Sequence, residues 1–209
     1  CSSDLVRSII QTRSGRIIVV VSQTIANPGR HVMLTYYSDD EGATWNHSNM
    51  IDLGGSGDHD GAMEGTIVEL KDGRIYALIR TKFGRFWEAY STDEGASWRT
   101  IQPSEIPASS SPAILQRLES GRIVMLWNRF RDPDRKLGRR EELSIAFSDD
   151  ECKTWSEPVV IARDLTPAGK KYENRVSYPY VTEITPGELW ITTMQGPVRL
   201  SLKEADFLK

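Results

Sequence analysis

The chain has 209 residues, of which 39% are hydrophobic and 26% charged, and its formal net charge is −3. This composition is that of an ordinary globular protein, long enough to bury a sizeable core. A small negative charge without a basic block gives no support for nucleic-acid binding, and no apolar run approaches the ~18 residues of a membrane span. The two cysteines, Cys1 and Cys152, are too few for a disulfide framework.

Paired apolar runs, each pair joined by a glycine-containing turn, recur along the chain. Short β-branched runs joined by such turns predict β-hairpins. The predicted hairpins occupy residues 8–20, 65–78, 112–126 and 180–191. Residues 128–142, rich in arginine, are predicted to form a long loop, and residues 202–208 a short helical turn.

A second pattern, S-x-D-x-G-x-[ST]-W, follows each of the first three hairpins. Its copies are Ser38–Trp45, Ser91–Trp98 and Ser148–Trp155. A period of about 50–60 residues indicates a repeat architecture. The pattern predicts a turn in which Ser and Asp bind backbone amides, Gly adopts positive φ and Trp anchors the turn in a core. Cys152 replaces the glycine of the third copy, at a cost of about 1 kcal/mol if the backbone is left-handed, so this turn should be looser.

Each hairpin and box is accompanied by two more strands, one leading into the box and one leaving it. Four antiparallel strands in each repeat predict an all-β propeller. We expect one partial propeller domain, with blades at about residues 5–60, 61–108, 109–165 and, incomplete, 176–209. A solenoid of stacked sheets is the alternative with the same period.

The boxes have the form of Asp-boxes, and the chain resembles the sialidase-like β-propeller family, which includes bacterial exo-sialidases. Its members are six-bladed, so the resemblance implies that this chain supplies about three complete blades and part of a fourth. We expect either a fragment whose missing blades precede Cys1, or a ring that associates with a partner through exposed blade edges. The family keeps its box aspartates away from the ligand, which makes Asp40, Asp93 and Asp150 structural.

Two charged residues flank the second hairpin. Glu64 opens its first strand and Arg80 closes its second. The resemblance implies that Glu64 is the base for a catalytic tyrosine and that Arg80 binds the carboxylate of the substrate. The residues alone leave another interpretation open, a structural ion pair across the hairpin.

The resemblance also implies roles for Tyr178 and Arg140. Tyr178, at the head of the fourth inner strand, matches the nucleophile, and Arg140, before the third box strand, matches another carboxylate-binding arginine. A neutral phenol suits an anomeric carbon that bears a carboxylate, because a carboxylate nucleophile would be repelled. Two guanidinium groups can hold that carboxylate by paired hydrogen bonds. Alternatively, Tyr178 only packs the propeller and Arg140 belongs to a solvated loop.

Two elements of the family pattern have no match here, the acid/base aspartate and the first carboxylate-binding arginine. Both are expected before Cys1. Within this chain, Asp58 or Asp60 could supply the acid. The triplet Asp58-His59-Asp60 is a poor chelator because its members are consecutive, so we expect neither a metal nor a cofactor.

The resemblance implies a retaining, exo-acting glycoside hydrolase for sialic-acid-like sugars in the full-length protein. Its partner would be a carbohydrate with a carboxylate-bearing terminal sugar, and its location secreted or periplasmic. Two alternatives stay open, a non-catalytic propeller that binds a glycan or a protein, and a glycosidase for another acidic sugar. The 209-residue chain alone is expected to be weakly active or inactive.

Overall fold

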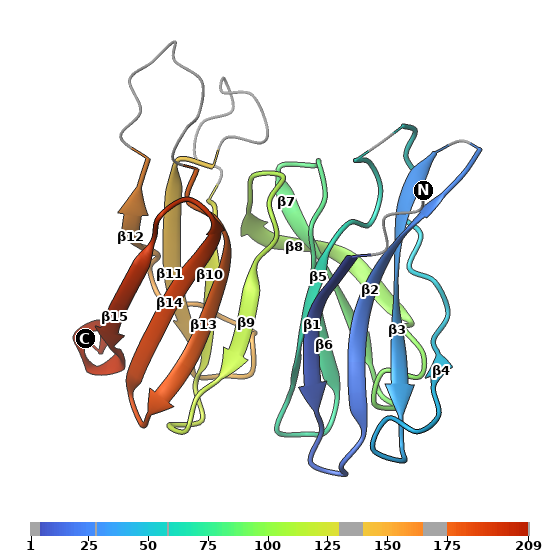
Figure 1. Cartoon of the computed structure of the whole chain (residues 1–209), viewed down its shortest axis with the longest axis horizontal. Coiled ribbons are helices and arrows are strands. Elements are labelled where there is room, and N and C mark those ends of the chain that lie inside the picture. Colours follow the sequence, from blue (N-terminus) through green and yellow to red (C-terminus); the bar gives the residue numbers. More distant parts are fainter. Residues whose placement is uncertain (1–4, 28, 58, 130–139, 165–174, 209) are drawn as a thin grey trace. The chain divides into compact units, whose positions relative to one another are not determined.

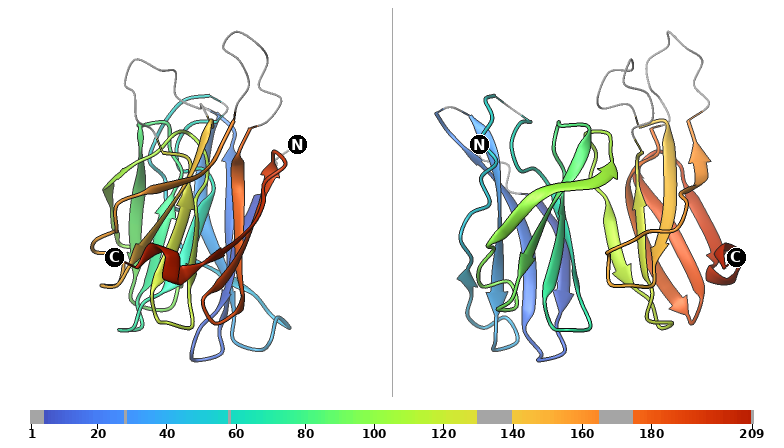
Figure 2. Two further views of the ribbon diagram at one scale, coloured as in Figure 1. Left: turned by 90° about the vertical axis from the view of Figure 1, so that its left-hand side faces the viewer. Right: turned by 180° about the vertical axis from the view of Figure 1, so that it is seen from behind.

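The structure, a computed structural model, describes residues 5–27, 29–57, 59–129, 140–164 and 175–208. Over these residues it is all-β, apart from one short 3-10 helix, η1 (Glu204–Phe207). The chain divides into two compact units, Cys1–Ser110 and Ser111–Lys209 (Figure 1). The predicted all-β class is confirmed, and the short helical turn expected near the C-terminus is η1, which follows the last strand (Figure 2).

The first unit contains two antiparallel sheets of four strands, each with its strands in sequence order. One sheet consists of β1 (Leu5–Gln11), β2 (Ile17–Ile25), β3 (Arg30–Ser38) and β4 (Asn46–His47). The other consists of β5 (Gly65–Glu69), β6 (Ile75–Ile79), β7 (Arg85–Ser91) and β8 (Thr100–Pro107). The first two predicted hairpins are therefore β1–β2 and β5–β6.

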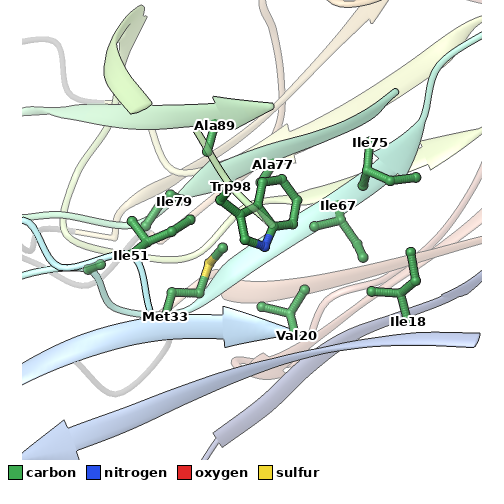
Figure 3. Close-up of a cluster of buried hydrophobic side chains, with 11 residues drawn as sticks. Ile18, Val20, Met33, Ile51, Ile67, Ile75, Ala77, Ile79, Ala89 and Trp98 are labelled. Carbon is green, nitrogen blue, oxygen red and sulfur yellow. The ribbon is translucent and has the colours of Figure 1, made fainter. Parts of the chain in front are cut away.

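One hydrophobic cluster joins the facing sides of these two sheets (Figure 3). Side chains from β2 and β3, such as Val20 and Met33, meet side chains from β5 and β6, such as Ile67 and Ala77. Trp98 of the second box lies among them and is only 2% exposed. Alternate residues of β2 point into this cluster, as the period of two in a strand requires.

The second unit also contains two antiparallel sheets. The four-stranded sheet consists of β9 (Ile114–Arg117), β10 (Ile123–Trp127), β11 (Glu142–Ser148) and β12 (Val159–Arg163). The three-stranded sheet consists of β13 (Ser177–Thr185), β14 (Glu188–Gln195) and β15 (Arg199–Lys203). Leu126 and Ile145 of one sheet share a buried cluster with Val181 and Ile191 of the other. The loop predicted at residues 128–142 falls largely outside the described residues.

The three boxes fold into the same turn. In the first, the Gly42 amide donates to Ser38 Oγ at 2.8 Å, while the Thr44 amide and hydroxyl donate to the two Asp40 carboxylate oxygens at 2.8 and 2.6 Å. Equivalent bonds with closely similar lengths occur in the other two boxes. The box aspartates thus make the turn-stabilising contacts that the sequence predicts.

The third box keeps the turn although a cysteine replaces the glycine. Cys152 adopts φ 65°, and its amide still donates to Ser148 Oγ at 2.9 Å. The bond from Ser148 Oγ to Asp150 is 3.0 Å, against 2.7 Å in the first two boxes, and the looser turn stays a prediction. The buried side chain of Cys152 occupies a place where the first two boxes have none. The anchoring role of tryptophan holds for Trp98 but not for Trp45, which is 43% exposed. The boxes have in common the hydrogen bonds that the Ser hydroxyl and the Asp carboxylate accept, rather than a buried indole.

Acid should weaken the first box. Hydrogen bonds, above all from the Thr44 hydroxyl, lower the pKa of Asp40 to about 2, whereas an aspartate in an unfolded chain titrates near ~3.9. Because the folded value is the lower one, the contribution of Asp40 to stability is complete above about pH 4 and is lost as the pH falls towards about 2. We expect Asp40→Asn to make the unfolding free energy less dependent on pH across this interval. Urea titrations at a series of pH values would measure this pH dependence.

The neighbouring exposed carboxylate supplies the control for this experiment. Glu41→Gln removes the same charge from the same turn, but none of the box hydrogen bonds described above uses its side chain. It should leave the pH dependence close to that of the unmodified chain. If the unfolding free energy depended equally on pH in Asp40→Asn and Glu41→Gln between pH 4 and 2, the lowered pKa of Asp40 would not be the cause of the acid sensitivity.

An arginine follows the hairpin turn in the β1–β4 sheet and again in the β9–β12 sheet. Arg16 donates from Nε to Asp39 at 2.6 Å and lies over the Tyr37 ring, with 4.5 Å between Cζ and the ring centroid. Arg122 repeats both contacts, an ion pair with Asp149 and stacking over Phe147. Each arginine therefore ties the hairpin turn of a sheet to the box at the end of its third strand.

Candidate functional site

Glu64 and Arg80 meet in the first unit, at the end of the β5–β6 hairpin. Gly65 pairs with Ile79, and beyond them the Arg80 amide donates to the Glu64 carbonyl at 3.0 Å. The Arg80 guanidinium donates from Nη1 to the Glu64 carboxylate. Both side chains are buried, at 5% and 4% exposure. Glu64 and Arg80 therefore form a buried ion pair across the hairpin.

A serine holds the other side of the same guanidinium. Arg80 Nε and Nη2 donate to Ser110 Oγ at 3.3 and 3.2 Å. Ser110 belongs to a run of three buried serines that precedes the third hairpin. Ser110 was not predicted as a site residue, although three consecutive small polar residues before an apolar strand are an unusual signal. Arg80 is thus fixed between a carboxylate and a hydroxyl.

Arg140 and Tyr178 meet in the second unit. The Arg140 Cζ atom lies 5.1 Å from the centroid of the Tyr178 ring, within the range of a cation–π contact. Arg140 Nη1 also donates to Gln195 Oε1 at 2.8 Å, and Ser177 Oγ donates to the same oxygen at 2.7 Å. Two residues predicted for the site are therefore brought together, and the sequence analysis missed Gln195 and Ser177.

Tyr178 has an unusual backbone conformation. Its φ is 58°, in the left-handed region, although it lies within β13 and directly precedes Pro179. A bulky residue with positive φ is an outlier, and a residue before proline ordinarily prefers extended geometry. Such a conformation costs about 1–3 kcal/mol, and strain of this kind is found preferentially at functional sites.

One buried amide joins the two chain segments that carry these two residues. Asn128, at 1% exposure, donates from Nδ2 to the carbonyls of Glu142 and Val176 at 2.9 and 2.8 Å. Its Oδ1 accepts a hydrogen bond from Ser111 at 2.7 Å. The Val176 amide in turn donates to the Arg140 carbonyl at 3.1 Å. The segments before Tyr178 and beside Arg140 are thereby held in one network.

The predicted acids lie in the loop before Glu64, and only one of them is described. Asp58 lies outside the described residues. Asp60 accepts hydrogen bonds from the backbone amides of Ser56 and Gly61, at 3.1 and 2.9 Å, one on each carboxylate oxygen. These contacts stabilise the loop itself, and the role of Asp60 as an acid stays a prediction.

The described residues contain neither a group of metal-ligating side chains nor a membrane-spanning helix. Among them, no three His, Cys, Asp or Glu side chains are grouped so that they could hold a metal ion. None of their helices has the length and apolar character required to cross a membrane.

A family model described as a BNR repeat-like domain matches residues 2–191. The chain belongs to the BNR repeat-like family. The resemblance to sialidase-like propellers that the Asp-boxes predict is therefore confirmed. No match was found among curated protein sequences.

Solved structures share the fold of this BNR repeat-like protein at low sequence identity. The NanB sialidase of Streptococcus pneumoniae is 18% identical, with a TM-score of 0.72 over 98% of this chain and 32% of that one. A protein of unknown function from Dyadobacter fermentans is 19% identical, with a TM-score of 0.67 over 92% and 50%. An α-L-arabinanase of Penicillium chrysogenum is 16% identical, with a TM-score of 0.59 over 90% and 56%.

These similarities establish the fold alone, because every identity is below 25%. They confirm the predicted fold class, a sialidase-type β-propeller of which this BNR repeat-like chain supplies three four-stranded sheets and one three-stranded sheet in the described residues. The chain spans only about a third to just over half of the length of these structures.

Proposed function

We propose that this BNR repeat-like protein is part of a glycoside hydrolase that releases terminal sialic-acid-like sugars with retention of configuration. The arrangement of Arg140 and Tyr178 carries the proposal. A tyrosine in a strained backbone conformation, with a guanidinium over its ring, suits a phenol nucleophile beside a group that binds a carboxylate. The family membership supports the same class of activity.

In the proposed reaction, the Tyr178 hydroxyl oxygen bonds to the anomeric carbon while the bond to the leaving alcohol breaks. Glu64 accepts the phenol proton, and an acid donates a proton to the departing oxygen. Asp58 and Asp60 are the candidates for that acid within this chain. Water then attacks the same carbon and gives a proton back to the deprotonated acid, while the bond to Tyr178 breaks and Tyr178 leaves with a proton returned from Glu64. Arg140 and Arg80 bind the substrate carboxylate.

A non-catalytic propeller is the second candidate, and one observation favours it. Glu64 and Arg80 bind each other in a buried ion pair that Ser110 completes, so their contacts have a structural explanation without any substrate. In that case Arg140, beside Tyr178 and Gln195, would bind an acidic glycan without cleaving it. A glycosidase for another acidic sugar is the third candidate, since a guanidinium accepts any carboxylate.

Activity of the full-length protein on fluorogenic glycosides tests the proposal. We expect hydrolysis of the N-acetylneuraminic acid glycoside and not of the glucuronide or the arabinoside. Tyr178→Phe removes the nucleophile, and Glu64→Gln removes its base, so each should lower kcat/KM by about 100-fold or more. Because the two groups act in one step, the double variant should lose far less than the product of the two factors.

The strand that carries Tyr178 also offers a matched control. Tyr180 lies two residues on in β13, is 44% exposed, and should tolerate Phe without loss of activity. Retention of activity within tenfold by Tyr178→Phe would overturn the assignment of the nucleophile. Binding of N-acetylneuraminic acid without hydrolysis of any glycoside would favour the non-catalytic candidate.

A further inference from the structure

We propose that the outer face of the β1–β4 sheet binds one further antiparallel sheet of the same repeat, which the full-length protein supplies from the same polypeptide. The outer face is the side of the sheet that carries Ile9, Val19 and Tyr36, which lie opposite one another on β1, β2 and β3. The other side of this sheet packs on the β5–β8 sheet. The docking of a sheet on the outer face is independent of the proposed function.

The sequence of β2 is typical of a strand that is buried on both sides. Residues Ile17–Val21 form an unbroken apolar run. A strand with one solvated side alternates apolar and polar residues, whereas a continuous apolar run indicates a strand between two packed layers. In the structure, Ile18 and Val20 lie in the cluster shared with the β5–β8 sheet, and the alternate residues of the run, on the outer face, remain partly exposed.

The β5–β8 sheet shows the same positions of the repeat when they are covered. Ile67 lies six residues before its turn glycine, as Ile9 does, and Ala89 lies two residues before its box serine, as Tyr36 does. Ile67 and Ala89 are 1% and 0% exposed, in the cluster that they form with the β1–β4 sheet (Figure 3). Ile9 and Tyr36 are 66% and 39% exposed. These positions are therefore buried in the sheet that has a preceding neighbour and exposed in the β1–β4 sheet.

The tryptophans of the first two boxes differ in the same way. Trp98 is buried, and its Nε1 donates to Thr35 Oγ1 of the preceding sheet at 3.0 Å. That hydroxyl donates in turn to the Gly95 carbonyl at 2.7 Å, so it lies between the indole and its own box. Trp45 is exposed and donates from Nε1 directly to the Gly42 carbonyl at 3.0 Å. The first box thus has both the donor and the acceptor that a hydroxyl of a further sheet would join.

These contacts specify the chemistry of the partner. It is an antiparallel sheet with an aliphatic side, like the side that β2 and β3 present to the β5–β8 sheet, and with one serine or threonine hydroxyl at the position of Thr35. Antiparallel sheets pack face to face through such apolar sides. The chain spans 32% of the NanB sialidase and 50% of the Dyadobacter fermentans protein, so one polypeptide of this fold has enough residues for further sheets.

The reactivity of a thiol at position 9 of the full-length protein tests the docking. Ile9→Cys places a thiol on the outer face, and mass spectrometry of peptides follows its alkylation by iodoacetamide separately from that of Cys1 and Cys152. Met50→Cys is the matched control, because Met50 is 48% exposed in the same unit. The residue at the corresponding position of the covered β5–β8 sheet, Pro103, is exposed. Each rate is divided by the rate of the same variant in urea.

We expect Ile9→Cys to react at least about tenfold more slowly than Met50→Cys, because a thiol between two sheets reacts only after local opening. Dilution of the protein should leave this ratio unchanged. Equal rates for the two thiols would overturn the docking. Protection that disappears on dilution, together with a dimer mass from light scattering, would overturn the choice of partner and assign the outer face to a second copy of the chain.

The Trp45 indole supplies a second measurement that does not depend on a substitution at position 9. NMR of the unmodified full-length protein gives the hydrogen-exchange rate of each indole Nε1, with the signals assigned through Trp45→Phe and Trp98→Phe. The Trp45 rate should lie within about tenfold of the Trp98 rate, because both indoles then lie between sheets. Exchange of Trp45 as fast as that of free tryptophan would overturn the docking. Hydrolytic activity enters neither measurement, so the proposed function can fail without affecting either result.

Discussion

Asn128→Asp should destabilise the second unit by about 3–5 kcal/mol, because it breaks a buried network and adds a buried charge. The substitution hardly changes the shape of the side chain. It removes the Nδ2 donor to the carbonyls of Glu142 and Val176 and places a carboxylate oxygen against both of them. Urea unfolding at neutral pH, followed by circular dichroism, would measure the loss. A large fraction of unfolded protein without urea would fit the same expectation.

Asn49→Asp is the matched control, since it makes the same substitution at an exposed position. Asn49 bridges the backbone of Trp98, donating to its carbonyl at 3.1 Å and accepting from its amide at 2.8 Å. Here one hydrogen bond is lost, against two at Asn128, and the new charge is solvated, so we expect a loss of about 1 kcal/mol. Equal losses for the two variants would show that burial of the Asn128 network contributes nothing.

Arg80→Met should destabilise the first unit by about 3–5 kcal/mol, because it leaves the buried Glu64 carboxylate without its guanidinium. Adding Glu64→Gln should restore a large part of this loss, because the remaining buried group is then neutral. The coupling between the two substitutions, taken from the four unfolding free energies, should reach about 2 kcal/mol. Urea unfolding of the unmodified protein, the two single variants and the double variant would give these four free energies.

An exposed ion pair in the same sheet serves as the comparison. Arg74 and Asp72 form a pair with 38% and 54% of their side chains exposed. Arg74→Met should cost less than about 1 kcal/mol, since exposed pairs contribute little. If Arg80→Met cost no more than Arg74→Met, the Glu64–Arg80 contact would not be the buried ion pair described here.

The parts of the fold that were predicted from sequence are the local ones. The hairpins depend on a glycine turn between two apolar runs, and each box depends on bonds that span only four residues, such as those from Ser38 to Gly42 and from Asp40 to Thr44. Interactions over so few residues can be predicted from a short stretch of sequence. The repeated arginines escaped prediction because the partner of Arg16, Asp39, lies 23 residues away in the next turn.

The candidate site was predictable only in part, for the same reason. Glu64 and Arg80 flank one hairpin, so their proximity follows from its register. Arg140 and Gln195 are 55 residues apart, and the packing of two sheets brings them together. The left-handed backbone of Tyr178 contradicts the local preference of a residue before proline, so sequence reasoning alone predicts the wrong conformation there. Packing in the folded unit decides these features.

The simple strand order of the sheets has a consequence for how the chain folds. Each strand in the described sheets pairs with strands that adjoin it in the sequence. Bringing together strands that are neighbours in the sequence costs less entropy than pairing distant ones, and topologies dominated by local pairings form quickly. During synthesis, each new strand can therefore pair with the strand that was made just before it. Each sheet can assemble soon after its last strand emerges, and the order of folding can follow the order of synthesis.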